Sequence, residues 1–313
     1  MMGGNDQRRW LRVRHDTVYH YGAPVELAHH LACLLPRETP WQAVRGWHLQ
    51  VSPRPALWAT DEPPPLAMSR DPWGNGRLLF GHDGPHERLQ VTSLFEAGLL
   101  APPLPQLWAE SSPPWEQVAE TLRYRSGGAP LEAAEFALAS PLAKPDAALA
   151  AFARRAFLPG QPLAASAQAL MSQIHREFRY LPMSTDVGTR ADQVLALGQG
   201  VCQDFAHLMI AACRSLGLAA RYVSGYLLTL PPPGQPRLIG ADASHAWVQV
   251  WCPQQGWLAL DPTNNVAAAL DHVTLAWGRD YADVAPLRGV IRGGGQAQPQ
   301  ASVTVEPLDA ARD

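Results

Sequence analysis

The sequence has 313 residues, of which 47% are hydrophobic, and a formal net charge of -3. This length suits two ordinary domains, and the apolar content is ample for packed cores. Because there is no basic excess, we expect neither nucleic acid nor an anionic membrane as a partner. The N-terminus lacks an apolar signal segment, and no stretch approaches the roughly 18 apolar residues of a membrane span, so we expect a cytoplasmic protein.

The first part of the chain reads as a β-rich domain. Residues 8–100 contain short alternating runs such as LRVRHDTVYHY and RLQVTSLFEA, separated by turn signals such as DPWGNG, which is typical of strands. Residues 101–162 change to proline clusters and alanine-rich pieces, and this predicts a connecting region with short helices. Apolar residues then recur at helical spacing over residues 163–178, which predicts a longer helix.

A second helix is predicted to begin at Cys202 and to end near Gly217, a favourable C-terminal cap. Three strand candidates follow, at residues 220–230, 244–252 and 256–263. The last two are separated by CPQQG, a hairpin signal. We therefore predict an α+β fold.

In that fold the β-rich domain is followed by a core over residues 163–290, in which the cysteine-bearing helix packs on an antiparallel sheet. Residues 291–313 form a predicted C-terminal tail with one possible last strand, ASVTVEP.

The four cysteines are scattered and form no C-x-x-C pair, which argues against a disulfide framework and a zinc site. We expect no metal and no cofactor. Cys202 differs from the others because it occupies the first turn of a helix, where free backbone N–H groups and the macrodipole favour a thiolate. Gly198 and Gly200 would let a substrate approach the backbone closely. For Cys202 a buried, purely structural cysteine explains the pattern equally well, whereas Cys33, Cys213 and Cys252 have no evident activator and are interpreted as structural.

A partner base is needed to decide between these readings. His245 opens one strand, and Asp261 ends the next. If Trp251 pairs with Trp257, His245 and Asp261 become diagonal neighbours on one face of the hairpin. A carboxylate there would orient the imidazole and stabilise imidazolium. Taken singly, Asp261 could merely begin a turn and His245 could be an edge residue, but together with Cys202 they form the order of nucleophile, base and orienter.

At these residues the sequence resembles the transglutaminase-like superfamily. The motifs are GVCQDFAHL at residues 200–208, ARYVSGY at 220–226, SHAWV at 244–248 and DPTN at 261–264. The first domain is similar to the bacterial β-type domain that precedes this core. The resemblance implies a papain-like core with Cys202 as nucleophile, His245 as base and Asp261 as orienter. It also implies a peptide or isopeptide substrate and a functional link to ATP-grasp proteins that form peptide bonds.

Other positions are weaker candidates. Four side chains could donate a hydrogen bond to an oxyanion, and packing or exposure is the alternative explanation for each of them: Tyr180, Gln199, Gln203 and Trp247. Asp204 could act at the site or simply cap its helix. Three further residues form either a solvated loop or a wall of the cleft: Asp280, Tyr281 and Asp283.

The leading functional hypothesis is hydrolysis of an amide or peptide through a thioester on Cys202. The first alternative is transglutamination, in which an amine takes the place of water. The second is a binding module that keeps the fold without turnover.

Overall fold

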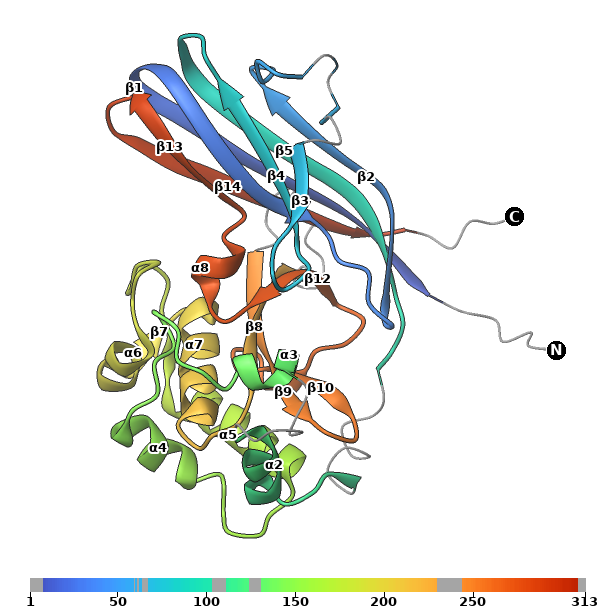
Figure 1. Cartoon of the computed structure of the whole chain (residues 1–313), viewed down its shortest axis with the longest axis vertical. Helices are drawn as coiled ribbons and strands as arrows, with labels where there is room; N and C mark the ends of the chain where they lie inside the picture. Colours follow the sequence, from blue (N-terminus) through green and yellow to red (C-terminus); the bar gives the residue numbers. More distant parts are fainter. Residues whose placement is uncertain are drawn as a thin grey trace, which may run out of the picture.

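A computed structural model describes residues 8–58, 60, 62–63, 67–102, 111–123, 131–229 and 244–308. Two lobes are visible in Figure 1, a β-sheet lobe and a mixed lobe that holds most of the helices. The predicted α+β class is confirmed. Parts of the predicted connecting region, the end of the predicted strand at 220–230 and the last five residues lie outside the described residues.

The β-sheet lobe is organised around one long strand, β1 (Arg9–Leu35). The sheet runs in the order β2-β5-β1-β4-β3, and its other strands are β2 (Gln42–Ser52), β3 (Met68–Arg70), β4 (Gly76–His82) and β5 (His86–Leu99). Along β1, buried residues such as Leu11 and Val13 alternate with exposed ones, as expected for a strand with one face on a core.

The C-terminal segment belongs to this same sheet. Strands β13 (Leu287–Gly293) and β14 (Ala297–Pro307) both pair antiparallel with β1. The predicted last strand therefore exists, but it lies in the N-terminal lobe, and β13 crosses the boundary that we placed at residue 290. The sequence pattern could not reveal this because the pairing joins segments almost 300 residues apart, as in Leu11 with Pro307.

The mixed lobe contains a second antiparallel sheet in the order β11-β10-β9-β8-β12. Its strands are β8 (Ala220–Leu227), β9 (Ser244–Cys252), β10 (Gly256–Asp261), β11 (Val266–Ala267) and β12 (His272–Gly278). A separate parallel pair joins β6 (Arg179–Tyr180) to β7 (Gln199–Gly200). The helices are α2 (Trp115–Leu122), α3 (Leu131–Glu135), α4 (Ala147–Arg154), α5 (Leu163–Glu177), α6 (Ala191–Leu197), α7 (Cys202–Arg214) and α8 (Tyr281–Val284).

Helix α7 is the centre of this lobe. Every residue from Asp204 to Arg214 is buried, because the sheet covers one side of the helix while α4, α5 and α6 cover others. The inward residues Ala246, Val248 and Val250 of β9 are buried, so the sheet presents small and β-branched side chains to the helix. The first residue of α7, Cys202, is thereby held by a fully packed element.

Two buried amide side chains join the lobes. Gln42 accepts from the N–H of Thr274 at 2.8 Å and donates to its carbonyl at 2.7 Å. Asn75 makes the same pair of bonds with Trp277, at 3.0 and 2.7 Å. These amides complete the outer backbone edge of β12, as a neighbouring strand would. A buried hydrogen bond of 2.8 Å between His15 and the hydroxyl of Tyr226 adds a third link.

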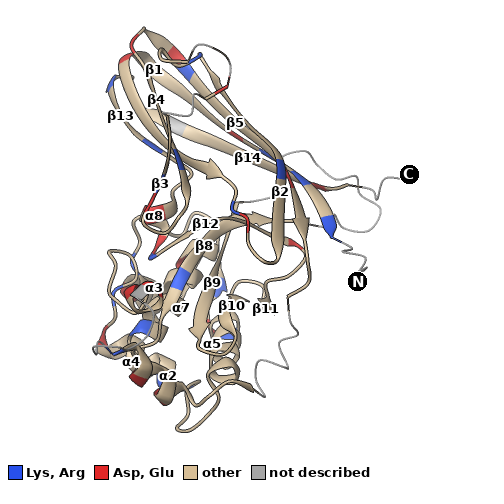
Figure 2. Cartoon of the chain, turned by 45° about the vertical axis from the view of Figure 1, so that its right-hand side comes forward, with Lys and Arg blue, Asp and Glu red and all other residues tan. Residues whose placement is uncertain are grey.

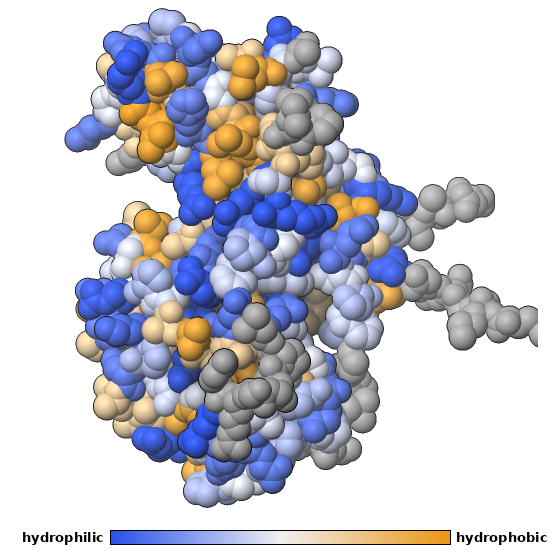
Figure 3. Space-filling view, viewed as in Figure 1, coloured by the Kyte–Doolittle hydropathy of each residue, from blue (hydrophilic) through white to orange (hydrophobic). Residues whose placement is uncertain are grey.

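The surface carries mixed charge. Basic and acidic residues are scattered along the ribbon of both lobes in Figure 2, and Figure 3 shows a hydrophilic band at the junction with apolar residues above it. Among the described residues, no helix is both long and apolar enough to cross a lipid bilayer.

Burial predicts that β14 contributes to stability. Val305 on β14 is fully buried, whereas Val290 on β13 is 71% exposed. We expect Val305→Ala to lower the free energy of unfolding in urea by about 2 kcal/mol, because two buried methyl groups are lost. Val290→Ala is the matched control and should change it by less than about 0.5 kcal/mol. Equal effects of the two substitutions would contradict this role for β14.

Candidate active site

Cys202 begins α7 and is the least buried of the four cysteines. Burial raises the pKa of the Cys213 thiol to about 12 and that of Cys33 to about 11. It also raises the pKa of Cys252. These three thiols are therefore poor nucleophiles at neutral pH, because the thiolate is the reactive form.

The chain reaches Cys202 through a tight turn. Gly198 ends α6 in the left-handed conformation, with φ of 66°. At Gly200, a β-carbon would lie only 2.7 Å from the side chain of Asp204, so no larger residue fits. The carboxylate of Asp204 accepts from the N–H of Val201 at 2.7 Å and from the hydroxyl of Thr185 at 2.6 Å. Asp204 thus caps the helix, which is the structural role considered above, and burial raises its pKa.

The hairpin of β9 and β10 has the predicted register. Trp251 pairs with Trp257, so His245 and Asp261 fall on the same face of the sheet. The imidazole Nε2 lies 2.7 Å from Asp261 Oδ2. Both side chains are buried, with His245 8% and Asp261 0% exposed.

Asp261 is the acceptor for a whole set of donors. Its Oδ1 accepts from the backbone N–H groups of Thr263 at 2.9 Å and Asn264 at 3.2 Å. Its Oδ2 accepts from the Asn264 amide at 2.7 Å and faces the Nε2 atoms of His245 and His272. Burial opposes ionisation, but hydrogen bonds from the two histidines outweigh it and hold the pKa of Asp261 well below its usual value. The carboxylate is therefore ionised.

The charge on Asp261 acts on His245. Burial favours the neutral imidazole, but hydrogen bonds to Asp261 and Cys202 raise the pKa of His245 from 6.5 to about 10. Because Asp261 occupies Nε2, Nδ1 is the ring nitrogen left for the Cys202 thiol. The structure thus brings together Cys202, His245 and Asp261 in the arrangement of nucleophile, base and orienter.

His272 is a site residue that the sequence analysis missed. Its Nε2 lies 3.1 Å from Asp261 Oδ2, and its Nδ1 accepts from the N–H of Ala269 at 3.4 Å. The ring thus bridges the Asp261 carboxylate and the backbone before β12. His272 opens β12, which is separated from β10 by two strands. No local pattern in the sequence brings those strand ends together, and the sequence analysis predicted no strand at His272.

Trp247 covers the imidazole pair. Its ring stacks on His245 with centroids 6.2 Å apart and meets the edge of His272 at 5.2 Å. Gly225, which pairs with His245, leaves room for it, because a β-carbon there would lie 2.5 Å from the indole. Trp247 is buried, so its clear role is to exclude water from the Asp261 hydrogen bonds.

Two other donor candidates differ in position. Tyr180 is half-exposed, and burial, with a smaller contribution from the charge of Cys202, raises its pKa. Gln199 precedes Gly200 on β7. Gln203 instead donates to the carbonyl of Val187 at 3.1 Å, which commits its amide to a loop.

The remaining candidates stabilise loops. Asp280 caps α8 through the N–H of Ala282 and accepts from the N–H of Leu142. Asp283 forms an ion pair with Arg279 at 2.9 Å. Tyr281 donates its backbone N–H to a buried histidine of α7. These contacts hold the segment that carries the chain from β12 back to the N-terminal sheet.

Three side chains in the described part of the chain have the composition of a metal-binding group. The ligand atoms of His245, Asp261 and His272 lie within 4.8 Å of one another. The same atoms are joined by hydrogen bonds, so a metal would have to displace the protons that the two histidines share with the carboxylate.

Alkylation tests whether Cys202 is activated. With iodoacetamide at pH 7, we expect native Cys202 to react at least about tenfold faster than Cys33, Cys213 or Cys252, because it alone is accessible and paired with an imidazole. His245→Ala should slow Cys202 by about tenfold or more, as measured by peptide mass spectrometry. The protein unfolded in guanidinium is the control, in which the four rates should converge. Equal native rates for Cys202 and Cys213 would contradict activation.

The raised pKa of His245 also predicts a pH dependence. Stabilisation by the imidazolium is fully present below about pH 6.5 and is lost as the pH rises through about 10. Asp261→Asn removes the anionic partner, so the His245 pKa should fall by more than about 1 unit in an NMR titration of labelled histidine. Asp283→Asn is the control and should leave it unchanged. An unaltered His245 pKa in Asp261→Asn would contradict this electrostatic coupling.

Comparisons with known proteins identify the family and the fold. The Transglutaminase-like superfamily matches residues 150–262, and the Bacterial transglutaminase-like N-terminal region matches residues 11–97. An uncharacterized protein of Mycobacterium tuberculosis (strain ATCC 25618 / H37Rv) is 40% identical over 287 residues, which cover 90% of this chain and 87% of that protein. An uncharacterized protein of Mycobacterium leprae (strain TN) is 30% identical over 304 residues, which cover 95% of this chain and 99% of that protein.

Two further similarities concern proteins with a described activity. A stretch of 110 residues is 37% identical to a protein-glutamine gamma-glutamyltransferase of Pseudomonas aeruginosa, covering 34% of this chain and 16% of that protein. The crystal structure of a candidate cysteine protease from Cytophaga hutchinsonii has the same fold, with a TM-score of 0.73 and 20% sequence identity. The match covers 98% of this chain and 93% of that chain. The chain belongs to the transglutaminase-like superfamily and carries its bacterial N-terminal region.

Proposed function

We propose that this protein is a cysteine-dependent acyl-transfer enzyme that hydrolyses an amide or peptide bond. The observation that carries the proposal is the position of His245, which interacts with the Cys202 thiol on one side and the ionised Asp261 on the other. Members of this superfamily are typically cysteine-dependent enzymes, and Cys202 is the least buried of the three side chains.

The reaction follows from these groups. The thiolate of Cys202 attacks the substrate carbonyl carbon, a C–S bond forms, and the carbonyl oxygen becomes an oxyanion. When the oxyanion collapses, the C–N bond breaks and His245 gives its proton to the leaving amine. The product is a thioester on Cys202. Neutral His245 then takes a proton from water, which attacks the thioester and releases the acid and the thiolate.

Two donors are available for the oxyanion. The N–H groups in the first turn of α7 have no partner within the helix, and the macrodipole favours negative charge there. Tyr180 is half-exposed, and the charge of Cys202 contributes to its raised pKa. We assign the Cys202 N–H and the Tyr180 hydroxyl to the oxyanion site.

Transfer to an amine is the second candidate. The sequence similarity to the Pseudomonas aeruginosa protein-glutamine gamma-glutamyltransferase favours it. Hydrolysis and transfer share every step up to the thioester, so the nucleophile that resolves the thioester decides between them.

A peptide-library experiment tests both candidates. We expect the wild type to cleave or deamidate a subset of peptides and Cys202→Ala to lose at least about 10³-fold of that rate, because triad members act as a unit. Cys213→Ala, a matched cysteine deletion in the same helix, should retain turnover. With excess cadaverine, hydrolysis gives acid products, whereas transfer gives amine adducts detected by mass spectrometry. Turnover that survives in Cys202→Ala would refute both candidates.

A further inference from the structure

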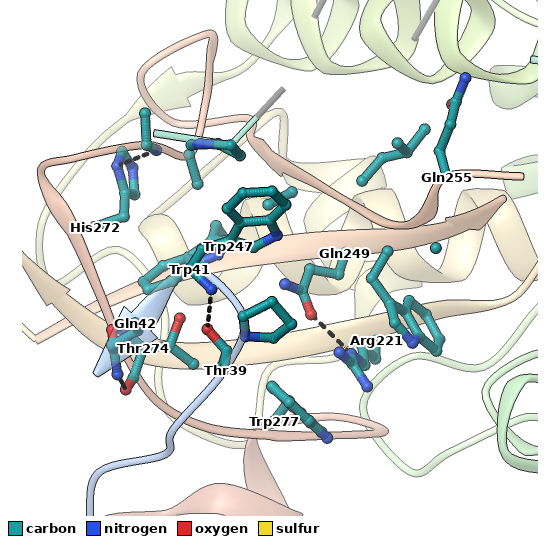
Figure 4. A pocket seen from close by; sticks show the side chains of 18 of the residues that line it. Thr39, Trp41, Gln42, Arg221, Trp247, Gln249, Gln255, His272, Thr274 and Trp277 are labelled. Atoms are coloured by element: carbon teal, nitrogen blue, oxygen red, sulfur yellow. Dashed lines mark hydrogen bonds between the residues drawn. The ribbon is translucent and has the colours of Figure 1, made fainter. Parts of the chain in front are cut away.

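A cavity of about 810 Å³ lies between the two lobes, beside the triad but separate from Cys202. Its floor is the face of the second sheet that also carries His245, and its opposite wall includes Trp41 of the N-terminal lobe. Figure 4 shows Trp247 in the middle, with His272 on one side and Arg221 bonded to Gln249 on the other. A cavity of this size is appropriate for a short peptide.

Arg221 is the unusual group in this cavity. Its side chain is 4% exposed, and its Nε donates to the Gln249 amide oxygen at 2.8 Å. Its Nη1 has no hydrogen-bond partner among the described residues. The nearest carboxylate, on Glu132, is 3.8 Å away on a side chain that is 72% exposed. A buried guanidinium with an unmet donor is costly unless an anion meets it.

A second guanidinium adds to the positive charge around Arg221, and the charges of Glu132 and Asp71 compensate the pair only in part. The guanidinium of Arg221 lies between the rings of Trp257 and Trp277, at 3.9 and 3.7 Å. On the other side of Trp277, Arg37 stacks at 3.5 Å, and the partners of Arg37 are the neutral Trp73 carbonyl and Asn75 amide. Indole rings hold a guanidinium in place but do not neutralise it. The geometry therefore leaves a fixed cation in the cavity wall.

We propose that this cavity binds a carboxylate-bearing peptide, with the carboxylate on Arg221 and apolar side chains against Trp41 and Trp247. Guanidinium is well matched to carboxylate because its planar N–H groups can donate in pairs. Arg221 pairs with Gln249, four residues along β9 from His245, which separates the two sites by about 13 Å along the strand. The Arg221 end of the cavity is thus distinct from the reaction centre, whereas His272 and Trp247 line the end nearer to it.

The test uses full-length Cys202→Ala protein and two probes, N-acetyl-leucyl-phenylalanine as the free acid and as its C-terminal amide. By isothermal titration calorimetry at pH 7, we expect the acid to bind at least about tenfold more tightly, because only the acid offers a charge-assisted hydrogen bond to Arg221. Equal affinities, or no binding of either probe at millimolar concentration, would overturn the proposal. The readout is independent of turnover, so failure of the proposed hydrolysis would not be confused with failure of this site.

Two substitutions assign the binding to Arg221. Glu132→Gln removes an exposed carboxylate that competes for Arg221. It should raise the affinity for the acid probe about two- to fivefold and leave the affinity for the amide probe unchanged. Arg221→Lys should abolish most of the preference for the acid. If Arg221→Lys does not fold, Glu132→Gln still decides: an unchanged acid affinity, together with a lower melting temperature, would make Glu132 the partner of Arg221 and overturn the site. Stronger displacement of the acid probe by inorganic phosphate than by acetate would overturn the assignment of a carboxylate as the group that Arg221 binds.

Discussion

The buried carboxylate of Asp261 is the constraint on which the rest of the site depends. A fully buried charge is tolerated only when donors meet it, and here the donors come from β9, from β12 and from the turn after β10. Strands β10 and β12 are separated by two others, yet His272 and Asp261 touch. One charged group therefore fixes how the ends of the sheet converge, and through His245 it fixes where the base meets the helix.

The two lobes serve this site in different ways. Helix α7 brings the Cys202 thiol to the sheet. Asp204 caps the start of this helix, so that the partly exposed Cys202 lies in its first turn. The N-terminal lobe contacts the opposite edge, where Gln42 and Asn75 bond to the backbone of β12. That strand carries His272 at its start. The position of the second histidine consequently depends on side chains that are about 200 residues away in the sequence.

Local patterns predicted the two longest helices and the β9–β10 hairpin, but not α6 or β12. The spacing from His245 to Asp261, with CPQQG between them, predicts the Trp251–Trp257 register that the structure has, because hairpin geometry is set by a few adjacent residues. His272 and the return of β14 to β1 were not predictable in this way. Both depend on pairings between distant segments, and alternation within a strand identifies its faces but not its neighbour.

Strand β1 also has a consequence for the order in which the protein is made. One edge of its first half pairs with β5, which is synthesised soon afterwards, while the other edge pairs with β14, among the last residues of the chain. During translation that second edge stays open while the whole mixed lobe is produced. An open edge is a template for pairing with other chains. The nascent protein can thus close this edge of β1 only after the mixed lobe has been made, and the edge is exposed to misassembly throughout that interval.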